Sequence, residues 1–300
     1  MRFKENFVEK YSKLIDFEAY KDSVLHRYAR QSIRINTIKC SVNEAVKNLQ
    51  KDGWILEEVP WCKEGFFIEH ESGRRDLGTT DQHKNGMFFS QGAPSMIPAQ
   101  LLDVDSHSVV LDMCAAPGGK TNHIACLMHN KGKIVANDAN GFRERILKIN
   151  MERCGVKNVV YTKEKAEDYF CREEFDAILI DAPCTGSGLI KGNIARTKKL
   201  LKEWNPNMIK KYARMQRKML EKAYSCLKNG GRMVYATCSI EPEEDEIVID
   251  AFLKDHKDCK NVTPRKINNY EIKSSLKNYL KIWPHYYDTN GLFIAALEKK

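Results

Sequence analysis

Two cysteines follow apolar segments, at positions where a thiol would face a bound ligand. Cys184 ends the sequence Asp-Ala-Pro-Cys that begins at Asp181, and Cys238 lies two residues after Ala236. The segments before them, Ala177–Ile180 and Met233–Tyr235, have the continuous apolar character of buried parallel strands. Ligands of an open α/β sheet bind just beyond the carboxyl ends of its strands. Both thiols are therefore expected to face one crevice.

A third apolar segment, Val109–Asp112, runs into a glycine turn that ends at Lys120 and contains Gly118 and Gly119. Glycines let the backbone approach a ligand closely, and the next helix offers free N–H groups. The stretch matches neither the G-x-G-x-x-G fingerprint of dinucleotide-binding proteins nor the P-loop. A ligand with a pyrophosphate is therefore not predicted.

An acid follows the next predicted strand, Lys133–Asn137. Asp138 lies about 26 residues after Asp112, where an acid at a second strand tip can accept hydrogen bonds from both ribose hydroxyls. A nucleoside cofactor without phosphates fits this combination, and S-adenosylmethionine is the common one. The alternative is that Asp138 caps the helix predicted to begin at Gly141.

Positive charge is concentrated in one segment. The chain has 300 residues and a formal net charge of +9. Between Lys191 and Lys222 there are eleven Lys or Arg and two acids, Glu203 and Glu221. A solvated helix face is one explanation, but the segment begins soon after Cys184, beside the predicted crevice. A polyanionic substrate is therefore favoured.

The composition indicates a cytoplasmic protein without a metal site. No apolar run approaches the roughly 20 residues that span a bilayer, and the charged N-terminus lacks a signal-peptide apolar region. The ten cysteines are scattered, with no Cys-x-x-Cys pair, so no zinc or iron–sulfur site is predicted. Most should be free thiols, with Cys126 and Cys226 as small core residues.

The pattern of elements predicts two domains. Residues 1–94 combine helical and strand patterns and are expected to form a small α+β domain. Residues 95–300 alternate strands and helices, which is typical of an α/β fold with a doubly wound, mostly parallel sheet. Near the end, Lys281–Pro284 and Leu292–Leu297 flank a turn-like segment and predict an antiparallel hairpin.

These residues resemble a known family. Asp112–Thr121 (DMCAAPGGKT), Asp181–Gly188 (DAPCTGSG) and Thr237–Ser239 (TCS) resemble, in order and spacing, motifs of the NOL1/NOP2/Sun (RsmB-like) family of RNA cytosine-5 methyltransferases. The resemblance covers most of the chain and includes Arg34–Asn36, Phe89–Gly92 and Trp283–His285. It implies a seven-stranded Rossmann-like methyltransferase sheet preceded by an RNA-recognition-like domain.

The resemblance also implies a cofactor site for S-adenosylmethionine. The loop that would wrap the methionine and ribose consists of Cys114, Ala115, Ala116, Pro117, Gly118, Gly119 and Lys120. Asp138 would hold the ribose, Arg143 would support that pocket, and Asp181 would border it. The family commonly has an acid beside the adenine, where this chain has Lys165, so Glu164 or Glu167 is a candidate substitute.

The chemistry of cytosine explains why two thiols and an acid belong together. Carbon 5 is a poor nucleophile until a thiolate adds to carbon 6, and a carboxyl group can offset the charge that moves toward N3. The carbon 5 proton must then leave, which needs a second group. By resemblance Cys238 is the nucleophile, Cys184 promotes release, and Asp181 and Lys120 act beside the base.

The surroundings of Cys238 lead to a further expectation. A helix is predicted to start near Pro242, and a helix N-terminus stabilises a thiolate. The acids Glu241, Glu243, Glu244, Asp245 and Glu246 oppose this and are interpreted simply as residues that favour a helix N-terminus.

The substrate predicted is RNA whose target base leaves its stack. The basic segment would meet phosphates, and Arg34 would help the N-terminal domain to grip RNA. Because compact family members often act on transfer RNA, tRNA is the first choice and ribosomal RNA the alternative, with a monomeric enzyme expected. A DNA cytosine methyltransferase, an inactive RNA-binding scaffold and a nicotinamide dehydrogenase are the less favoured readings.

Overall fold

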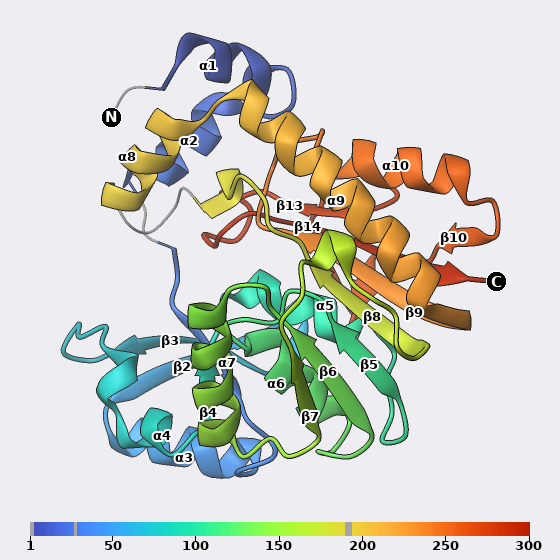
Figure 1. Cartoon of the computed structure of the whole chain (residues 1–300). Coiled ribbons are helices and arrows are strands. Elements are labelled where there is room, and N and C mark those ends of the chain that lie inside the picture. The colour runs from blue at the N-terminus through green and yellow to red at the C-terminus, as the bar shows by residue number, and fades with distance from the viewer. Residues whose placement is uncertain (1–2, 27–28, 190–193) are drawn as a thin grey trace.

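A large twisted sheet forms the centre of the molecule (Figure 1). The computed structural model describes residues 3–26, 29–189 and 194–300, so Lys191 of the basic segment lies outside the described residues. Hydrogen-bonded neighbours follow the order β10-β14-β9-β8-β5-β6-β7, and β13 pairs with β14 as an eighth strand within these residues. The strand bounds are β5 Val109–Asp112, β6 Lys133–Asn137, β7 Val159–Thr162, β8 Phe175–Asp181, β9 Leu227–Thr237, β10 Cys259–Asn261, β13 Leu280–Ile282 and β14 Leu292–Lys299.

Strands β7, β6, β5, β8 and β9 run parallel, whereas β14 is antiparallel to β9 and β13. The predicted hairpin is therefore present, and its second strand lies directly beside the strand that leads to Cys238. Residues of β14 and β9 pair in register from Phe293 with Thr237 to Glu298 with Arg232.

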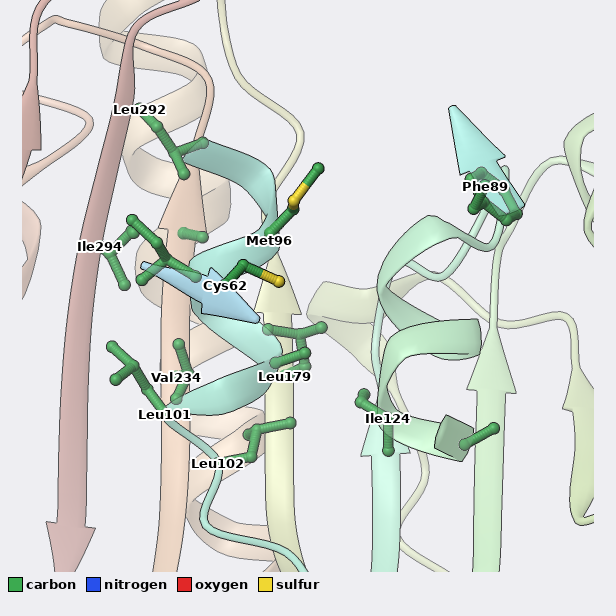
Figure 2. Close-up of a cluster of buried hydrophobic side chains, with 14 of the residues drawn as sticks. Cys62, Phe89, Met96, Leu101, Leu102, Ile124, Leu179, Val234, Leu292 and Ile294 are labelled. Carbon is green, nitrogen blue, oxygen red and sulfur yellow. The ribbon is translucent and has the colours of Figure 1, made fainter. Parts of the chain in front are cut away.

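Alternation along the buried strands creates two apolar layers. In β8, Ala177 and Leu179 face one layer, while Ile178 and Ile180 face the other. This period of two is the signature of a strand covered on both faces. The helices flanking the sheet are α5 Ile97–Gln100, α6 Gly119–Leu127, α7 Gly141–Cys154, α9 Pro206–Cys226 and α10 Glu246–Asp255. Figure 1 shows α9 and α10 together on one face of the sheet, and Figure 2 shows part of the layer on the opposite face.

The smaller sheet lies beside α6 and α7, with the order β2-β3-β1-β4. Its strands are β1 Ser32–Ile35, β2 Trp54–Val59, β3 Cys62–His70 and β4 Phe88–Ser90. The helices in the same part of the chain are α3 Val42–Lys51, η1 Leu77–Thr79, α4 Asp81–Lys84 and η2 Ala93–Met96. Helix α3 begins where the Ser41 side chain accepts a hydrogen bond from the Glu44 N–H, a standard N-cap. Leu49 and Ala45 of α3 pack under Trp54 and Ile33.

The first two helices pack away from the smaller sheet. Helices α1 Glu5–Ser12 and α2 Phe17–His26 join a buried cluster with Trp204 near the end of α8 Ile194–Glu203, and with Ile240 and Trp283. They therefore cover the end of the large sheet where the thiols lie. The domain boundary after residue 94 stays a prediction.

One cysteine differs from the prediction in its covalent state. Cys226 is buried in the core as predicted, but it is paired with Cys171 in a disulfide rather than free. The pairing joins the turn before β8 to the end of α9.

Among the described residues, no helix has both the length and the apolar character needed to cross a bilayer.

Candidate active site

The loop after β5 is held by backbone contacts to neighbouring strands. The Met113 N–H donates to the Leu179 carbonyl at 2.9 Å, and the Ala115 N–H donates to the Asn137 carbonyl at 2.8 Å. Gly118 adopts a left-handed φ of 106°, and a Cβ there would lie 2.6 Å from the Met151 methyl group. The left-handed conformation therefore favours glycine at this position, and a larger residue would also have to displace the Met151 side chain. Residues 114–120 consequently lie at the carboxyl end of the sheet, as predicted.

Asp138 faces this loop and does not cap the next helix. Asn140 is the N-cap of α7, because its side chain accepts from the Phe142 and Arg143 N–H groups. Asp138 is 4% exposed, and it accepts from the Ala116 N–H at 3.3 Å and from the Asn140 N–H at 3.0 Å. Each carboxylate oxygen can accept more than one hydrogen bond, so capacity for two hydroxyl donors remains.

Arg143 supports the same corner of the site. Its guanidinium lies 3.4 Å from the Asp138 carboxylate and donates to the Ala116 carbonyl at 2.5 Å. Asn150 of α7 adds a hydrogen bond to the Pro117 carbonyl at 2.9 Å. Helix α7 thus fixes both the carboxylate and the turn of the loop.

The end of β7 supplies the residues considered for an adenine contact. Lys165 is exposed, and the Glu164 carboxylate binds the Arg172 guanidinium and the Phe170 N–H. The backbone of Glu164 is tied to the Asn137 side chain at 2.8 and 2.9 Å. The Glu164 side chain is therefore committed to the turn at residues 170–172, and the adenine contact stays a prediction.

The two thiols predicted to converge are in contact. Cys184 Sγ and Cys238 Sγ lie 3.0 Å apart, and both side chains are half-buried. The contact with Cys238, followed by burial, raises the pKa of Cys184 well above its ordinary value. Two thiolates at this distance would repel each other strongly, so at least one of the two sulfurs carries a proton.

Lys120 and Asp181 form an ion pair that joins the cofactor loop to the thiol loops. Lys120 Nζ lies 2.6 Å from Asp181 Oδ2, and the Asp181 side chain is about one-third exposed. Asp181 is the last residue of β8, three residues before Cys184. The pair therefore places a carboxylate and an ammonium group between the predicted cofactor and the thiols.

Glu244 holds the two cysteine loops together, a role that the sequence interpretation missed. Its carboxylate accepts from the Thr185 N–H at 2.9 Å, the Thr185 hydroxyl at 2.5 Å, the Ser239 hydroxyl at 3.2 Å and the Gln216 amide at 3.0 Å. Four donors meet one buried carboxylate, while burial raises its pKa. Thr185 follows Cys184 and Ser239 follows Cys238, so Glu244 positions both.

Glu241 and Asp245 also have buried partners. Asp245 and Glu246 do lie at the start of α10, as interpreted, but Glu241 and Glu244 precede it and have other roles. Glu241 accepts from the Tyr11 hydroxyl and from Trp204 Nε1, and it pairs with Lys10 at 2.7 Å. Asp245 accepts from the Thr237 hydroxyl at 2.6 Å and lies 3.1 Å from Lys281 Nζ.

The predicted helix start near Pro242 is also incorrect, since α10 begins at Glu246. The cysteine at position 238 therefore lies in a loop rather than at a helix N-terminus. Backbone contacts hold that loop, because the Gly188 N–H donates to the Cys238 carbonyl at 2.9 Å and the Gly291 N–H donates to the Gly188 carbonyl at 2.8 Å.

Arg34 does not face solvent, so the expectation that it grips RNA is incorrect. Its side chain is fully buried and donates to Asn122 Oδ1 at 2.7 Å, Gln91 Oε1 at 3.0 Å and the Gly119 carbonyl at 3.2 Å. The guanidinium instead fixes the first turn of α6, directly after the cofactor loop.

A basic groove runs along α9 beside the thiol loops. A cavity of about 510 Å³ is lined by Glu167, Asn207, Lys210, Lys211, Tyr212, Arg214, Met215 and Lys218. The four cationic side chains are exposed, whereas Tyr212 is half-buried. Burial, followed by the charges of Cys184, Glu244 and Cys238, raises the pKa of Tyr212. Tyr212 therefore lies between the groove and the thiols.

The sheet order, the loop after β5 and the carboxylate after β6 define a Rossmann-like methyltransferase fold. Residues 99–298 match the family model described as 16S rRNA methyltransferase RsmB/F, and residues 3–93 match the N-terminal domain of 16S rRNA methyltransferase RsmF. The chain belongs to the RsmB/F family.

Relatives and solved structures agree with this assignment. Proteins called Ribosomal RNA small subunit methyltransferase F, from Serratia proteamaculans and Escherichia coli, are 37% identical over 279 and 280 residues. These alignments cover 91% of this chain but only 58% of the relatives, so the chain spans about three fifths of their length.

A methyltransferase homolog protein from Pyrococcus horikoshii is 34% identical, with a TM-score of 0.85, and covers 99% of this chain and 96% of its own. The structure of NSun6 from Pyrococcus horikoshii with SFG is 25% identical, with a TM-score of 0.87, and covers 99% and 98%. The predicted family and fold are confirmed, whereas the dehydrogenase and DNA methyltransferase alternatives are not supported.

Proposed function

We propose that this protein transfers the methyl group of S-adenosylmethionine to carbon 5 of a cytosine in RNA, and that the RNA is small-subunit ribosomal RNA. The contact between Cys184 and Cys238, beside the Lys120–Asp181 pair, carries the chemical part of this proposal. The substrate rests on relatives called small subunit methyltransferases. The expectation of tRNA rests on compactness alone. The names of these relatives favour ribosomal RNA instead.

The residues at the strand ends fit S-adenosylmethionine. Asp138 retains acceptor capacity for two ribose hydroxyls, and small side chains from Ala115 to Gly119 leave room for a ligand along the loop. When bound, the cofactor would supply a methyl group on a sulfonium, and attack of an electron-rich carbon on that methyl group would release the sulfur as a neutral thioether.

The first chemical step is assigned to Cys238. Its thiolate forms a bond to carbon 6, and the electron pair of the double bond between carbons 5 and 6 becomes available at carbon 5. Asp181 accepts a hydrogen bond from the exocyclic amino group, and the Lys120 ammonium group beside it offsets the charge that moves into the ring. Carbon 5 then receives the methyl group and still carries its proton.

The second step is assigned to Cys184, and the sulfur–sulfur contact explains its timing. Before the reaction, Cys238 raises the pKa of Cys184. Once Cys238 Sγ is bonded to carbon, its negative charge no longer opposes ionisation of Cys184, which can lose its proton to water. Cys184 then takes the carbon 5 proton, the double bond re-forms, and Cys238 leaves as a thiolate.

The groove along α9 is the proposed path of the RNA backbone. Lys210, Lys211, Arg214 and Lys218 offer positive charge along one exposed side of the helix. Tyr212 offers an aromatic surface between this groove and the thiols, where a base could stack. The same groove therefore accounts for both backbone binding and delivery of a base.

The proposal is tested by incubating the protein and methyl-labelled S-adenosylmethionine with three unmodified substrates: 16S rRNA, small ribosomal subunits and total tRNA. Mass spectrometry of the nucleosides is expected to find 5-methylcytosine in the ribosomal samples. Methylation of tRNA alone would overturn the ribosomal assignment, and no 5-methylcytosine in any sample would overturn the activity.

The RNA path is tested with Lys210→Gln/Lys211→Gln and a control in exposed Lys254 of α10, Lys254→Gln. The double variant is expected to weaken RNA binding at low salt and to reduce the salt slope by about two, while the control remains near wild type. Equal effects of both variants would contradict the groove.

A further inference from the structure

Three side chains with metal-binding atoms meet between the two sheets. Cys62 and Glu64 lie two residues apart in β3 and so project to the same side of the strand. His123 comes from α6, and its ring nitrogens, the Cys62 sulfur and the Glu64 carboxylate offer ligand atoms that all lie within 4.8 Å of one another. Cys62 Sγ is 3.7 Å from Glu64 Oε2.

His123 is the anomalous member of this group. Its side chain is 1% exposed, yet neither ring nitrogen has a hydrogen-bond partner among the described residues. Buried polar atoms are nearly always paired, because an unpaired one loses its hydrogen bonds to water without replacement. A neutral imidazole has one nitrogen lone pair available, and a metal ion is one of the ligands that it can bind.

The site is reachable and its charge can be balanced. A cavity of about 590 Å³ is lined by residues that include Glu64, His123 and Arg34. Arg34 donates its hydrogen bonds to four uncharged acceptors rather than to Glu64, so the Glu64 carboxylate remains available as a ligand. The acceptors are the Gln91 and Asn122 side chains, the Gly119 carbonyl and the Cys126 sulfur. A thiolate and a carboxylate together cancel the two charges of a divalent ion, so the buried guanidinium would face a neutral group.

We propose that Cys62, Glu64 and His123 bind one zinc-class divalent ion. Sulfur, imidazole nitrogen and carboxylate oxygen are the ligand types that zinc accepts, and three protein ligands leave a fourth position for water. The ion joins β3 of the smaller sheet to α6, the helix that follows the cofactor loop. Figure 2 shows Cys62 beside Met96 in the apolar layer.

The zinc content of the full chain tests the proposal independently of methyl transfer. Protein dialysed against zinc at controlled concentration is analysed for metal per chain, and cobalt(II) replacement is followed by the thiolate charge-transfer absorption. The thiol pair is a competing site, so both measurements use the Cys184→Ala/Cys238→Ala background. About one equivalent of metal and a thiolate band are expected.

Matched variants separate ligation from packing. Cys62→Ser, Glu64→Gln and His123→Gln are each expected to weaken zinc binding at least about tenfold, since each removes one ligand. Cys259→Ser, at a buried cysteine of β10, should bind as tightly as the background protein. If Cys62→Ser fails to fold, the other two variants decide. Less than a tenth of an equivalent of metal, or unchanged affinity in all three variants, would overturn the site.

Discussion

The cofactor half and the thiol half of the active site are built in different ways. In the cofactor half, strand ends and the helices that follow them make the contacts, as in the bonds from Ala115 to Asn137 and from Ala116 to Asp138. In the thiol half, Cys184 and Cys238 depend on Glu244, on Gln216 of α9 and, through Glu241, on Tyr11 of α1. The cofactor loop can be held by contacts from neighbouring strands and helices. The reactive sulfur pair, in contrast, is held by segments that are distant along the chain.

The largest effect is expected from removing the nucleophile. Cys238→Ala should lower methyl transfer by at least about a thousandfold, because no other group can add to carbon 6 at this position. The affinity for S-adenosylmethionine, measured by isothermal titration, should stay near wild type, since Cys238 is not among the residues assigned to the cofactor. Turnover near wild type would reject the assignment of Cys238.

Removing the second thiol is expected to trap the reaction. Cys184→Ala should accumulate a protein–RNA adduct that survives denaturing electrophoresis, with multiple turnover reduced about a hundredfold or more. The double variant Cys184→Ala/Cys238→Ala is the control and should form no adduct. A Cys184→Ala protein that turns over normally without an adduct would contradict the release role.

A substitution of Glu244 tests whether the thiol half depends on its buried carboxylate. Four donors converge on Glu244, and in Glu244→Gln one acceptor oxygen becomes an NH2 group that faces donors. We expect the free energy of unfolding to fall by about 1–3 kcal/mol. We also expect kcat to fall about 10- to 100-fold with unchanged cofactor affinity, because about 1 Å of misplacement has effects of this size.

The matched control is Glu243→Gln, whose side chain is 42% exposed and pairs with Lys10. Little change is expected there, since exposed ion pairs contribute less than about 1 kcal/mol. A loss of cofactor affinity in Glu244→Gln would show that the two halves are not separable.

The cofactor half is tested by a substitution of Asp138, which should affect cofactor binding and leave the thiol half intact. Asp138→Asn should weaken S-adenosylmethionine binding about 10- to 100-fold, because hydrogen bonds to a charged acceptor contribute about 1.5–3 kcal/mol. At saturating cofactor, trapping of RNA on a Cys184→Ala background should persist. Arg145→Gln on the same helix serves as the control, and equal losses in both variants would contradict the ribose assignment.

A separate prediction concerns stability alone and its dependence on pH. Burial raises the pKa of Asp112 from 3.8 to about 7, while the Thr121 hydroxyl opposes the shift. The folded state therefore holds this proton more tightly than the unfolded chain, and stability from this group is lost as pH rises from about 4 to 7. Relative to wild type, Asp112→Asn should gain up to about 4 kcal/mol between these limits. Urea unfolding at pH 5 and 8, with exposed Glu174→Gln as control, measures the difference.

Local periodicity predicted much of the fold. The predicted strand Lys133–Asn137 matches the structure at both ends, and the predicted helix does begin at Gly141. Helix Val42–Lys51 is also marked by local residues. Helix Val42–Lys51 has clear apolar patterning, and Ser41 and Asn140 cap the two helices through their own side chains. The information for these elements is contained within the elements themselves.

The thiol half was only partly predictable. The cysteines and Asp181 could be found because they follow strands, but the acids after Cys238 favoured a helix start that the structure does not have. Their partners Tyr11, Trp204 and Gln216 come from segments that no local pattern connects to them. Glu244 has three polar partners that only the folded chain brings together.

The same reasoning explains Arg34 and the group of Cys62, Glu64 and His123. Arginine in a half-buried strand favours a solvent-facing interpretation, whereas its acceptors lie more than 50 residues away along the chain. Spacing rules for metal sites search for ligands close in sequence, and His123 is on a different element from the other two. Only the packing of the smaller sheet on α6 brings them together.

The position of β14 has a consequence for synthesis of the protein. This strand follows all the others along the chain, yet it lies between β10 and β9 and pairs with residues up to Thr237, next to the nucleophile. A nascent chain that has not yet released residues 292–299 from the ribosome can complete the loop after β5 but not the support for position 238. Support for the reactive cysteine should therefore form only after β14 has been synthesised, and a ribosome-stalled fragment lacking β14 should be inert toward RNA.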